Sequence, residues 1–442
     1  MSTPKNSAMI YKILLIFVLS QLFLFLNILG IGQNYVPEPR VGQAAVLIED
    51  KIYYIGGYKF NQSQLTSDVF YLDVNEFKFI WTDLVSLGAN LTLTSWHTAS
   101  PNGISLDSIF ILGGVHLDEA NMNYVYKLDI KTNIISAPII QGKTPQPRQG
   151  MNSAVGIEGK IYILGGYVGS GDNIIFVNSL DILDTINLSW SVGSLVNSPV
   201  GRIYYTATFL NDGTIYYIGG KVDRNNFSPM TEIYQYDTIG DKWSLKTATA
   251  EVAETMPGPR IGHTAVLLGS GKIIVYGGLY YNNDIPYGIP SKETIAMLDI
   301  TTLAWSIPPL ENFNNIPKLA FHSANLLYDV AMIITFGNNT DIPNSNNQYN
   351  RFIYAFLLVG QKYKWITVIL DAPTKDSIKP KSKSEIPSPN ISKTSPPQSN
   401  SHSKIIIVCV SIGSVAAGLT LFVASIFAYK RIKKNHKNQS SG

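Results

Sequence analysis

Cysteine is almost absent from this chain of 442 residues, because Cys409 is the only one. Residues 33–371 therefore contain no disulfide, although a segment of about 340 residues can bury enough apolar surface to fold without one. Charged residues are also sparse, at 15%. The formal net charge of +3 conceals an uneven distribution, since residues 33–371 hold 21 Lys and Arg against 29 Asp and Glu. An acidic segment of this kind argues against a nucleic-acid partner.

Recognisable catalytic motifs are missing as well. The sequence has no nucleophile elbow, no phosphate-binding loop and no zinc-protease helix. Paired acids such as Glu49-Asp50 and Asp118-Glu119 lie in expected turns, where solvation explains them better than acid–base chemistry. We therefore expect a protein without enzymatic activity and without a cofactor.

What the chain does contain is a repeated glycine pair, and such a period of about 50 residues is typical of propellers and arrays. Successive pairs are separated by 57, 52, 54 and 58 residues, and a degenerate sixth copy, Gly337-Asn338, follows after 60 more. The five pairs are Gly56-Gly57, Gly113-Gly114, Gly165-Gly166, Gly219-Gly220 and Gly277-Gly278. Short Val-, Ile- and Tyr-rich runs flank each pair and predict antiparallel strands, about four in each repeat.

Three other residue types recur in phase with the glycines. An arginine precedes the first strand in four copies, at Arg40, Arg148, Arg202 and Arg260, where copies two and six have Thr94 and Leu319. An aspartate follows the third strand in five copies, at Asp73, Asp129, Asp184, Asp237 and Asp299. A tryptophan marks the fourth strand at Trp81, Trp190, Trp243, Trp305 and Trp365. We interpret these residues as structural rather than catalytic.

This combination closely resembles the kelch repeat over residues 38–371. The resemblance implies an all-β protein whose residues 33–371 form a six-bladed kelch β-propeller; a seventh blade would need strands from the chain ends. Some kelch-like propellers are copper oxidases that resemble galactose oxidase, but they need a tyrosine–cysteine cross-link that a cysteine-free propeller cannot form. The propeller histidines are His97, His116, His263 and His322. Three of them occupy the same first-strand position, which permits either local hydrogen bonds or a metal-binding ring of imidazoles.

The ends of the chain predict a membrane protein. Residues 1–32 combine a basic start with an apolar run and small residues, which indicates a signal peptide or an uncleaved signal anchor. Residues 405–429 are apolar and long enough to span a bilayer as a transmembrane helix, and the basic tail 430–442 follows. Residues 372–404 form a Ser/Pro/Lys-rich stalk. The predicted topology is type I, with the propeller extracellular or lumenal.

In that topology, Asn-x-Ser/Thr sequons become candidates for glycosylation. Six of them precede the apolar segment: Asn61, Asn90, Asn187, Asn226, Asn338 and Asn390.

Candidate binding residues lie in the loops that follow the glycine pairs, because propeller loops gather on two faces. Tyrosine, asparagine and aspartate are typical of recognition surfaces. The fourth and fifth copies supply Lys221, Arg224, Tyr280, Tyr281, Asp284 and Tyr287. We expect a non-enzymatic propeller that binds a protein or other ligand outside the cytosol. The alternative is a lectin or carbohydrate-active enzyme that uses the same loops on a glycan.

Overall fold

A computed structural model of the chain describes residues 35–60, 64–88, 91–92, 94–116, 123–282, 287–311, 316–343, 348–359 and 362–368. All of these belong to one compact unit, Met1–Thr374. The expected all-β class is confirmed, since the helical elements of the described part are only α2 (Val85–Gly88) and three short 3-10 turns. These turns are η1 (Asn75–Phe77), η3 (Gly171–Asn173) and η4 (Ala253–Thr255).

Six sheets of four or five strands account for most of the described residues, and we number them in chain order. Sheet 1 contains β2 (Ala44–Ile48), β3 (Lys51–Ile55), β6 (Val69–Asp73) and β7 (Ile80–Asp83). Sheet 2 contains β9 (Thr98–Pro101), β10 (Ser108–Leu112), β12 (Val125–Asp129) and β13 (Ile134–Ser136). Sheet 3 contains β14 (Ser153–Val155), β15 (Lys160–Leu164), β18 (Leu180–Asp184) and β19 (Ser189–Val192).

The other three large sheets repeat this antiparallel order. Sheet 4 contains β20 (Thr206–Phe209), β21 (Thr214–Ile218), β22 (Glu232–Asp237) and β23 (Lys242–Thr247). Sheet 5 contains β25 (Thr264–Leu267), β26 (Lys272–Tyr276), β29 (Ile295–Asp299) and β30 (Ala304–Ser306), with β24 (Thr249–Ala250) added in parallel. Sheet 6 contains β33 (Ser323–Leu327), β34 (Ala331–Thr335), β36 (Ile353–Val359) and β37 (Lys362–Val368), with β31 (Leu310–Glu311) added in parallel.

Small sheets form where the chain connects the second and third strands of a repeat. They are β1 (Arg40–Val41) with β4 (Tyr58–Lys59) and β5 (Gln64–Leu65), β8 (Thr94–Ser95) with β11 (Val115–His116), β16 (Tyr167–Val168) with β17 (Ile175–Phe176), β27 (Leu279–Tyr280) with β28 (Ile289–Pro290), and β32 (Leu319–Ala320) with β35 (Asn338–Asn339). Most of these small sheets lie next to the residues that precede the first strand of a large sheet. They therefore surround one end of the ring, the end at which the candidate site is found.

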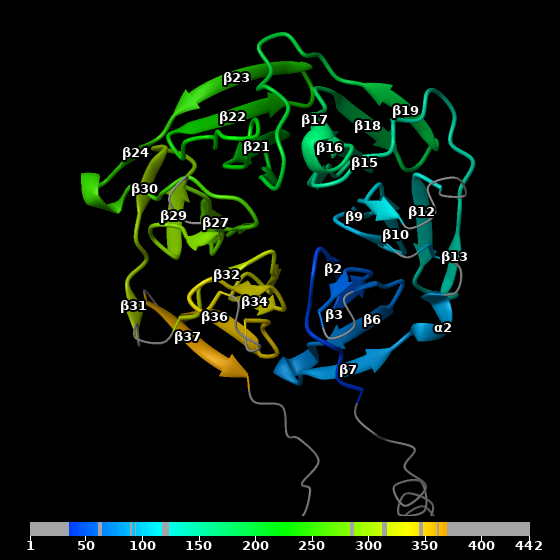
Figure 1. Cartoon of the computed structure of the whole chain (residues 1–442), viewed down its shortest axis with the longest axis horizontal. Coiled ribbons are helices and arrows are strands. Elements are labelled where there is room, and N and C mark those ends of the chain that lie inside the picture. The colour runs from blue at the N-terminus through cyan, green and yellow to red at the C-terminus, as the bar shows by residue number, and fades with distance from the viewer. Residues whose placement is uncertain are drawn as a thin grey trace, which may run out of the picture. The chain divides into compact units, whose positions relative to one another are not determined.

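The large sheets stand in a ring, with their first strands toward the centre and their fourth strands at the rim (Figure 1). First strands of neighbouring sheets contact each other in the order β2, β9, β14, β20, β25 and β33, and β33 in turn contacts β2. The described sheets therefore surround a central channel.

The glycine pairs explain how neighbouring sheets approach so closely. A Cβ at Gly277 would lie 2.1 Å from the carbonyl oxygen of Leu319 on the next sheet, which no side chain can tolerate. The second glycine of each pair donates its N–H to that neighbour, as Gly278 does to Leu319 at 2.8 Å.

The glycine pair of the sixth copy lies one residue earlier in the structure than the sequence predicts. Gly337 donates to the carbonyl of Arg40 on the first sheet at 3.1 Å, so Gly337 corresponds to the second glycine of a pair. Phe336, with φ of +59°, occupies the first position. The expected equivalence with Gly337-Asn338 was wrong, because a phenylalanine adopts the backbone conformation that glycine adopts elsewhere.

The recurring tryptophans and aspartates have the structural roles expected of them. Trp305 is fully buried between sheets 4 and 5, and its indole Nε1 donates to the carbonyl of Met230 at 2.8 Å. Asp299 Oδ1 accepts the backbone N–H groups of Thr301 and Thr302 at 2.9 and 3.0 Å. These bonds stabilise the turn between the third and fourth strands.

Within the described residues, no helix has the length and apolar character that a membrane span requires. The predicted signal segment 1–32, stalk 372–404, transmembrane helix 405–429 and tail 430–442 lie outside the described residues.

Candidate functional site

One set of equivalent positions encircles the channel just before the first strands. We call these six residues the mouth positions, and glycine alternates with an aromatic residue around them. They are Gly42, Trp96, Gly150, Tyr204, Gly262 and Phe321. Every one of them has a positive φ, between +53° and +70°.

The backbone explains why all six adopt the left-handed conformation. Each mouth position after Gly42 donates to the preceding one: Trp96 N–H donates to Gly42 O at 2.7 Å and Tyr204 N–H donates to Gly150 O at 2.8 Å. Equivalent bonds run from Gly150 to Trp96, from Gly262 to Tyr204 and from Phe321 to Gly262. This series of hydrogen bonds links sheets 1 to 6 in order and requires a conformation that glycine adopts freely and bulky residues do not.

The three aromatic rings meet one another across the channel. Their centroids are 5.1 Å apart for Trp96 and Phe321, 5.3 Å for Tyr204 and Phe321, and 5.4 Å for Trp96 and Tyr204. All three pairs are edge-to-face, an arrangement that aromatic quadrupoles favour. All three side chains are half-buried, so each keeps part of its surface exposed.

Each ring rests on the glycine of the preceding sheet. An added Cβ at Gly42 would lie 2.9 Å from the Trp96 indole, and one at Gly262 would lie 2.7 Å from the Phe321 ring. The alternation therefore has a steric cause: an aromatic residue at one mouth position needs glycine at the one before it.

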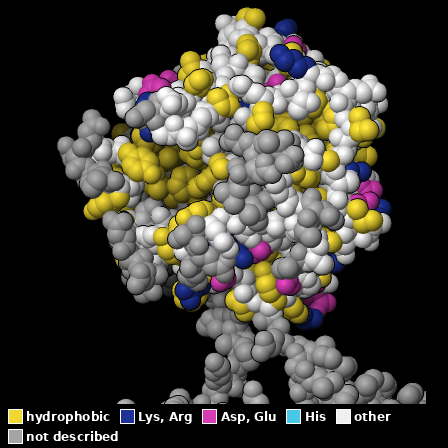
Figure 2. Space-filling view, turned by 45° about the vertical axis from the view of Figure 1, so that its right-hand side comes forward, with side chains coloured by type: hydrophobic (Ala, Val, Ile, Leu, Met, Phe, Trp, Pro, Cys, Tyr) yellow, Lys and Arg dark blue, Asp and Glu magenta, His cyan; other side chains and the backbone are white. Residues whose placement is uncertain are grey.

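A cavity of about 150 Å³ adjoins these rings. Among the described residues that line it there is no Asp, Glu, Lys or Arg. The side of the molecule drawn in Figure 2 has a hollow in which apolar side chains gather.

Tyrosine hydroxyls lie at the edge of the aromatic group. Tyr167 Oη and Tyr204 Oη are 3.1 Å apart. Burial, together with the neighbouring Tyr167, raises the pKa of Tyr204 well above its usual value. The Tyr204 hydroxyl therefore stays protonated at physiological pH and can donate a hydrogen bond.

Two residues predicted from the sequence join this group. Lys221 Nζ lies 5.7 Å from the centroid of Tyr281 and 5.5 Å from that of Phe227, within the range of cation–π attraction. Partial burial lowers the pKa of Lys221. Tyr281 is 44% exposed and is close enough to Tyr204 to influence its pKa. We call Trp96, Tyr204 and Phe321, together with Tyr281 and Lys221, the aromatic mouth. It extends onto the loop of sheet 5 that carries Tyr281.

The other predicted binding residues lie elsewhere or cannot be placed. Tyr280 is part of β27, where it pairs with Ile289 and is half-buried. Tyr287 is 39% exposed, and Arg224 lies in the exposed turn that follows Lys221. Asp284 lies outside the described residues.

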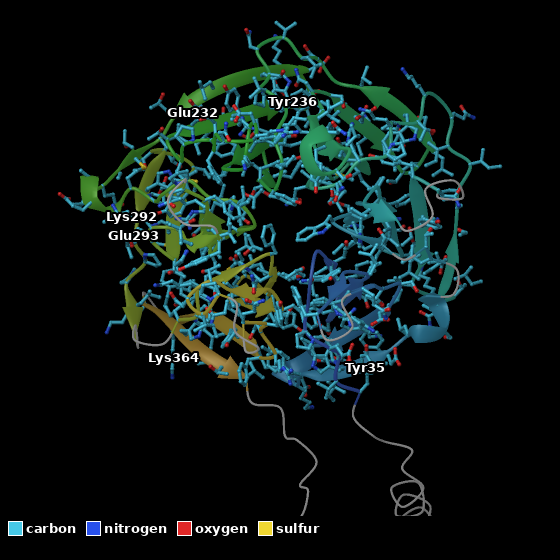
Figure 3. All side chains as sticks on the ribbon, viewed as in Figure 1. Tyr35, Glu232, Tyr236, Lys292, Glu293 and Lys364 are labelled. Atoms are coloured by element: carbon cyan, nitrogen blue, oxygen red, sulfur yellow. The ribbon has the colours of Figure 1, made fainter. Side chains whose placement is uncertain are left out.

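A larger cavity, of about 550 Å³, lies between β28, which connects two strands of sheet 5, and the loop of sheet 6. Lys292 and Glu293, side by side in Figure 3, contribute to its lining. Its lysines already have partners: Lys292 Nζ donates to the Glu254 carbonyl at 2.6 Å, and Lys318 pairs with Asp341 at 3.0 Å. This cavity offers less to a ligand than the aromatic mouth does.

The channel histidines pack between sheets. His263 and His322 are buried, and their imidazole Nε2 atoms lie 3.2 and 2.8 Å from the hydroxyls of Thr206 and Thr264. Burial lowers the pKa of His263 well below its usual value and that of His322 to about 3. Within the described part of the chain, no group of three or more His, Cys, Asp or Glu could hold a metal ion.

Three of the six sequons fall within the described residues. Asn187 and Asn226 are exposed, and their amide nitrogens donate to Asp184 at 2.8 Å and Asp223 at 2.7 Å. Asn338 is part of β35, and its side-chain oxygen is enclosed by the protein, so this position is a poor acceptor for a bulky glycan. Asn61, Asn90 and Asn390 lie outside the described residues.

Comparison with known proteins agrees with the repeat pattern. The KLHDC2/KLHL20/DRC7 Kelch-repeats domain family matches residues 42–278. Kelch domain-containing protein 3 of Rattus norvegicus is 29% identical over 255 residues, which cover 54% of this chain and 64% of that protein. The chain thus matches less than two thirds of that relative's length.

A plant relative and a solved structure extend the comparison. Acyl-CoA-binding domain-containing protein 5 of Arabidopsis thaliana is 26% identical over 323 residues, covering 71% of this chain and 45% of that protein. The solved structure titled "Structure of YjhT" superposes with a TM-score of 0.59 at 14% identity and covers 75% of this chain and 98% of its own. At that identity the likeness supports the fold alone.

Proposed function

Since the chain belongs to the kelch-repeat family, we propose that it is a non-enzymatic binding module that recognises a partner protein at the aromatic mouth. The observation that carries this proposal is the cluster of half-buried rings at Trp96, Tyr204 and Phe321, extended by Tyr281 and Lys221. Large aromatic side chains, above all Trp and Tyr, carry much of the binding energy of protein interfaces.

The arrangement suits recognition better than chemistry. The mouth holds tyrosine hydroxyls that stay protonated and a lysine that contacts an aromatic ring, and the described lining of its cavity has no carboxylate. Binding there would bury apolar surface around a few polar contacts, which is the usual composition of an interface core.

Capture of partners with the full-length, tagged protein tests the proposal. The informative variant combines Lys221→Ala with Tyr281→Ala, and the control is Ile157→Ser, an exposed residue in the turn before β15 that is 82% exposed. Losing one anchoring aromatic costs about 2 kcal/mol, so the double variant should retain partners about thirtyfold less well. Equal retention by wild type and double variant would contradict the proposal, and selective capture of glycans would favour the carbohydrate-binding alternative.

We further propose that six blades complete the ring and that the propeller is displayed by a type I, single-pass membrane protein. The contact between β2 and β33 supports ring closure. The apolar run 405–429 and the basic residues after it support the topology. If the propeller is extracellular, protease added outside intact cells should degrade it and spare the tail; a protected propeller would indicate an internal membrane or an inverted topology.

A further inference from the structure

Three bulky residues occupy backbone conformations that glycine would adopt without strain. Trp96, Tyr204 and Phe321 have φ of +58°, +53° and +55°, a left-handed conformation that is unfavourable for residues with a Cβ. The other three mouth positions are glycines, so the backbone of the ring does not require a side chain there. Strain that is kept where a simpler residue would serve points to a role for the side chains.

We propose that these three rings form the floor of a site for a proline-rich peptide in the extended polyproline conformation. The inference rests on the proposed function and names the ligand class of the same surface. Peptides of this kind bind grooves lined by aromatic residues, because their preformed helix loses little entropy and their prolyl rings pack on aromatic faces.

The size and composition of the mouth fit such a ligand. A cavity of about 150 Å³ adjoins the rings, and a cavity of that size holds a ring of six carbons. A single prolyl ring therefore fits against Trp96, Tyr204 and Phe321. Because the described lining has no Asp, Glu, Lys or Arg side chain, the residues on the floor require no charge in the peptide.

The hydrogen-bonding groups at the edge also match. A proline-rich segment offers backbone carbonyls but few N–H groups, so its binding site must supply donors. Within the Tyr167–Tyr204 pair one hydroxyl donates to the other across 3.1 Å, which leaves the second hydroxyl proton for a ligand carbonyl.

A glycan is less well matched to this floor. Sugar hydroxyls need acceptors and donors close together, and the described lining has no carboxylate. The two amides of the lining are engaged through their nitrogens: Gln43 Nε2 donates to Ser323 Oγ at 2.7 Å, and Asn152 Nδ2 donates to Tyr205 O at 3.3 Å.

The test measures binding of a decaproline peptide to the full-length protein by calorimetry and by tryptophan fluorescence. A Gly-Ser peptide of equal length and a neutral oligosaccharide serve as comparison ligands. We expect saturable binding of decaproline alone, with a fluorescence change that disappears in Trp96→Phe while calorimetry still detects binding. The Tyr167→Phe, Tyr204→Phe double variant should bind about fivefold more weakly, the value of one lost hydrogen bond. Ile157→Ser, in a turn at the far end of the strands, should bind like wild type.

The possible results separate the ligand class from the site. Absence of decaproline binding, or preference for the oligosaccharide, overturns the proposal. Equal decaproline binding by wild type and by the tyrosine double variant at unchanged melting temperature also overturns it. If decaproline fails to bind while Lys221→Ala with Tyr281→Ala still loses captured partners, the proposed binding function stands and only the ligand class is wrong.

Discussion

At the scale of single residues, the candidate site consists mainly of residues that differ from those at the same position in other copies of the repeat. The repeat markers Arg, Asp, Trp and Gly-Gly explain packing, and sequence reasoning identified them. Lys221 and Tyr281 were also predicted, from loop composition, and the structure brings them together. Trp96, Tyr204 and Phe321 were missed, although each stands in phase where the odd-numbered copies have Gly42, Gly150 and Gly262. A search for in-phase replacements of glycine would have found them.

Strain at Trp96 can be measured with two substitutions. Trp96→Gly and Trp96→Ala both remove the ring, but only glycine relieves the positive φ. We expect the glycine variant to be more stable than the alanine variant by about 1 kcal/mol in urea unfolding. At Trp305, in β30, the order should reverse by about 0.5–1 kcal/mol, because glycine weakens a strand. The same order at both sites would contradict the assignment of strain.

The buried imidazoles make stability depend on pH in a defined window. The pKa of His322 is about 3 in the folded protein against an ordinary value of 6.5, so the unfolded chain binds the proton first. Stability from this group is therefore complete above about pH 6.5 and falls as the pH decreases toward 3. The loss at pH 5 should be about 2 kcal/mol, and His263 changes in the same direction. Unfolding curves of His322→Gln at pH 7 and pH 5 should differ less than those of wild type; an equal difference would contradict this origin.

At the scale of secondary structure, the sequence located the strands better than their connections. The second strands were found because Val, Ile and Tyr precede each glycine pair, as in β26. The sixth copy was placed one residue late, because Phe336 carries the conformation that a glycine would have signalled. The parallel additions β24 and β31 were not predicted, since two paired residues leave no periodic pattern.

Fourth strands should be sensitive to the loss of their tryptophan. Trp305 is fully buried and its indole N–H is bonded, so Trp305→Ala should cost about 3–5 kcal/mol of unfolding free energy. Trp81 is only partly buried, so Trp81→Ala should cost less. Urea unfolding monitored by circular dichroism measures both, and equal costs would contradict the link to burial.

At the scale of the whole ring, sheets 1 and 6 are each built from one continuous stretch of the chain. Short linkers pair with the outer strands of sheets 5 and 6, but no described strand crosses from sheet 6 to sheet 1. That boundary is held by lateral contacts, including Gly337 N to Arg40 O at 3.1 Å, Gln43 to Ser323 at 2.7 Å and Thr335 to Tyr54 at 2.9 Å. We expect amide hydrogens at this boundary to exchange before those between sheets 4 and 5, where β24 pairs with β30, as native-state hydrogen exchange would measure. Faster exchange between sheets 4 and 5 would contradict this order.

The same boundary determines where the ring would yield to a pulling force. The described chain enters beside β2 and leaves from β37, so its two ends belong to the two sheets that meet there. Tension applied through both ends would load the lateral contacts of this one boundary before it reached any strand pairing inside a sheet. Under force, sheets 1 and 6 would therefore separate first and the ring would open there, while every sheet stayed folded.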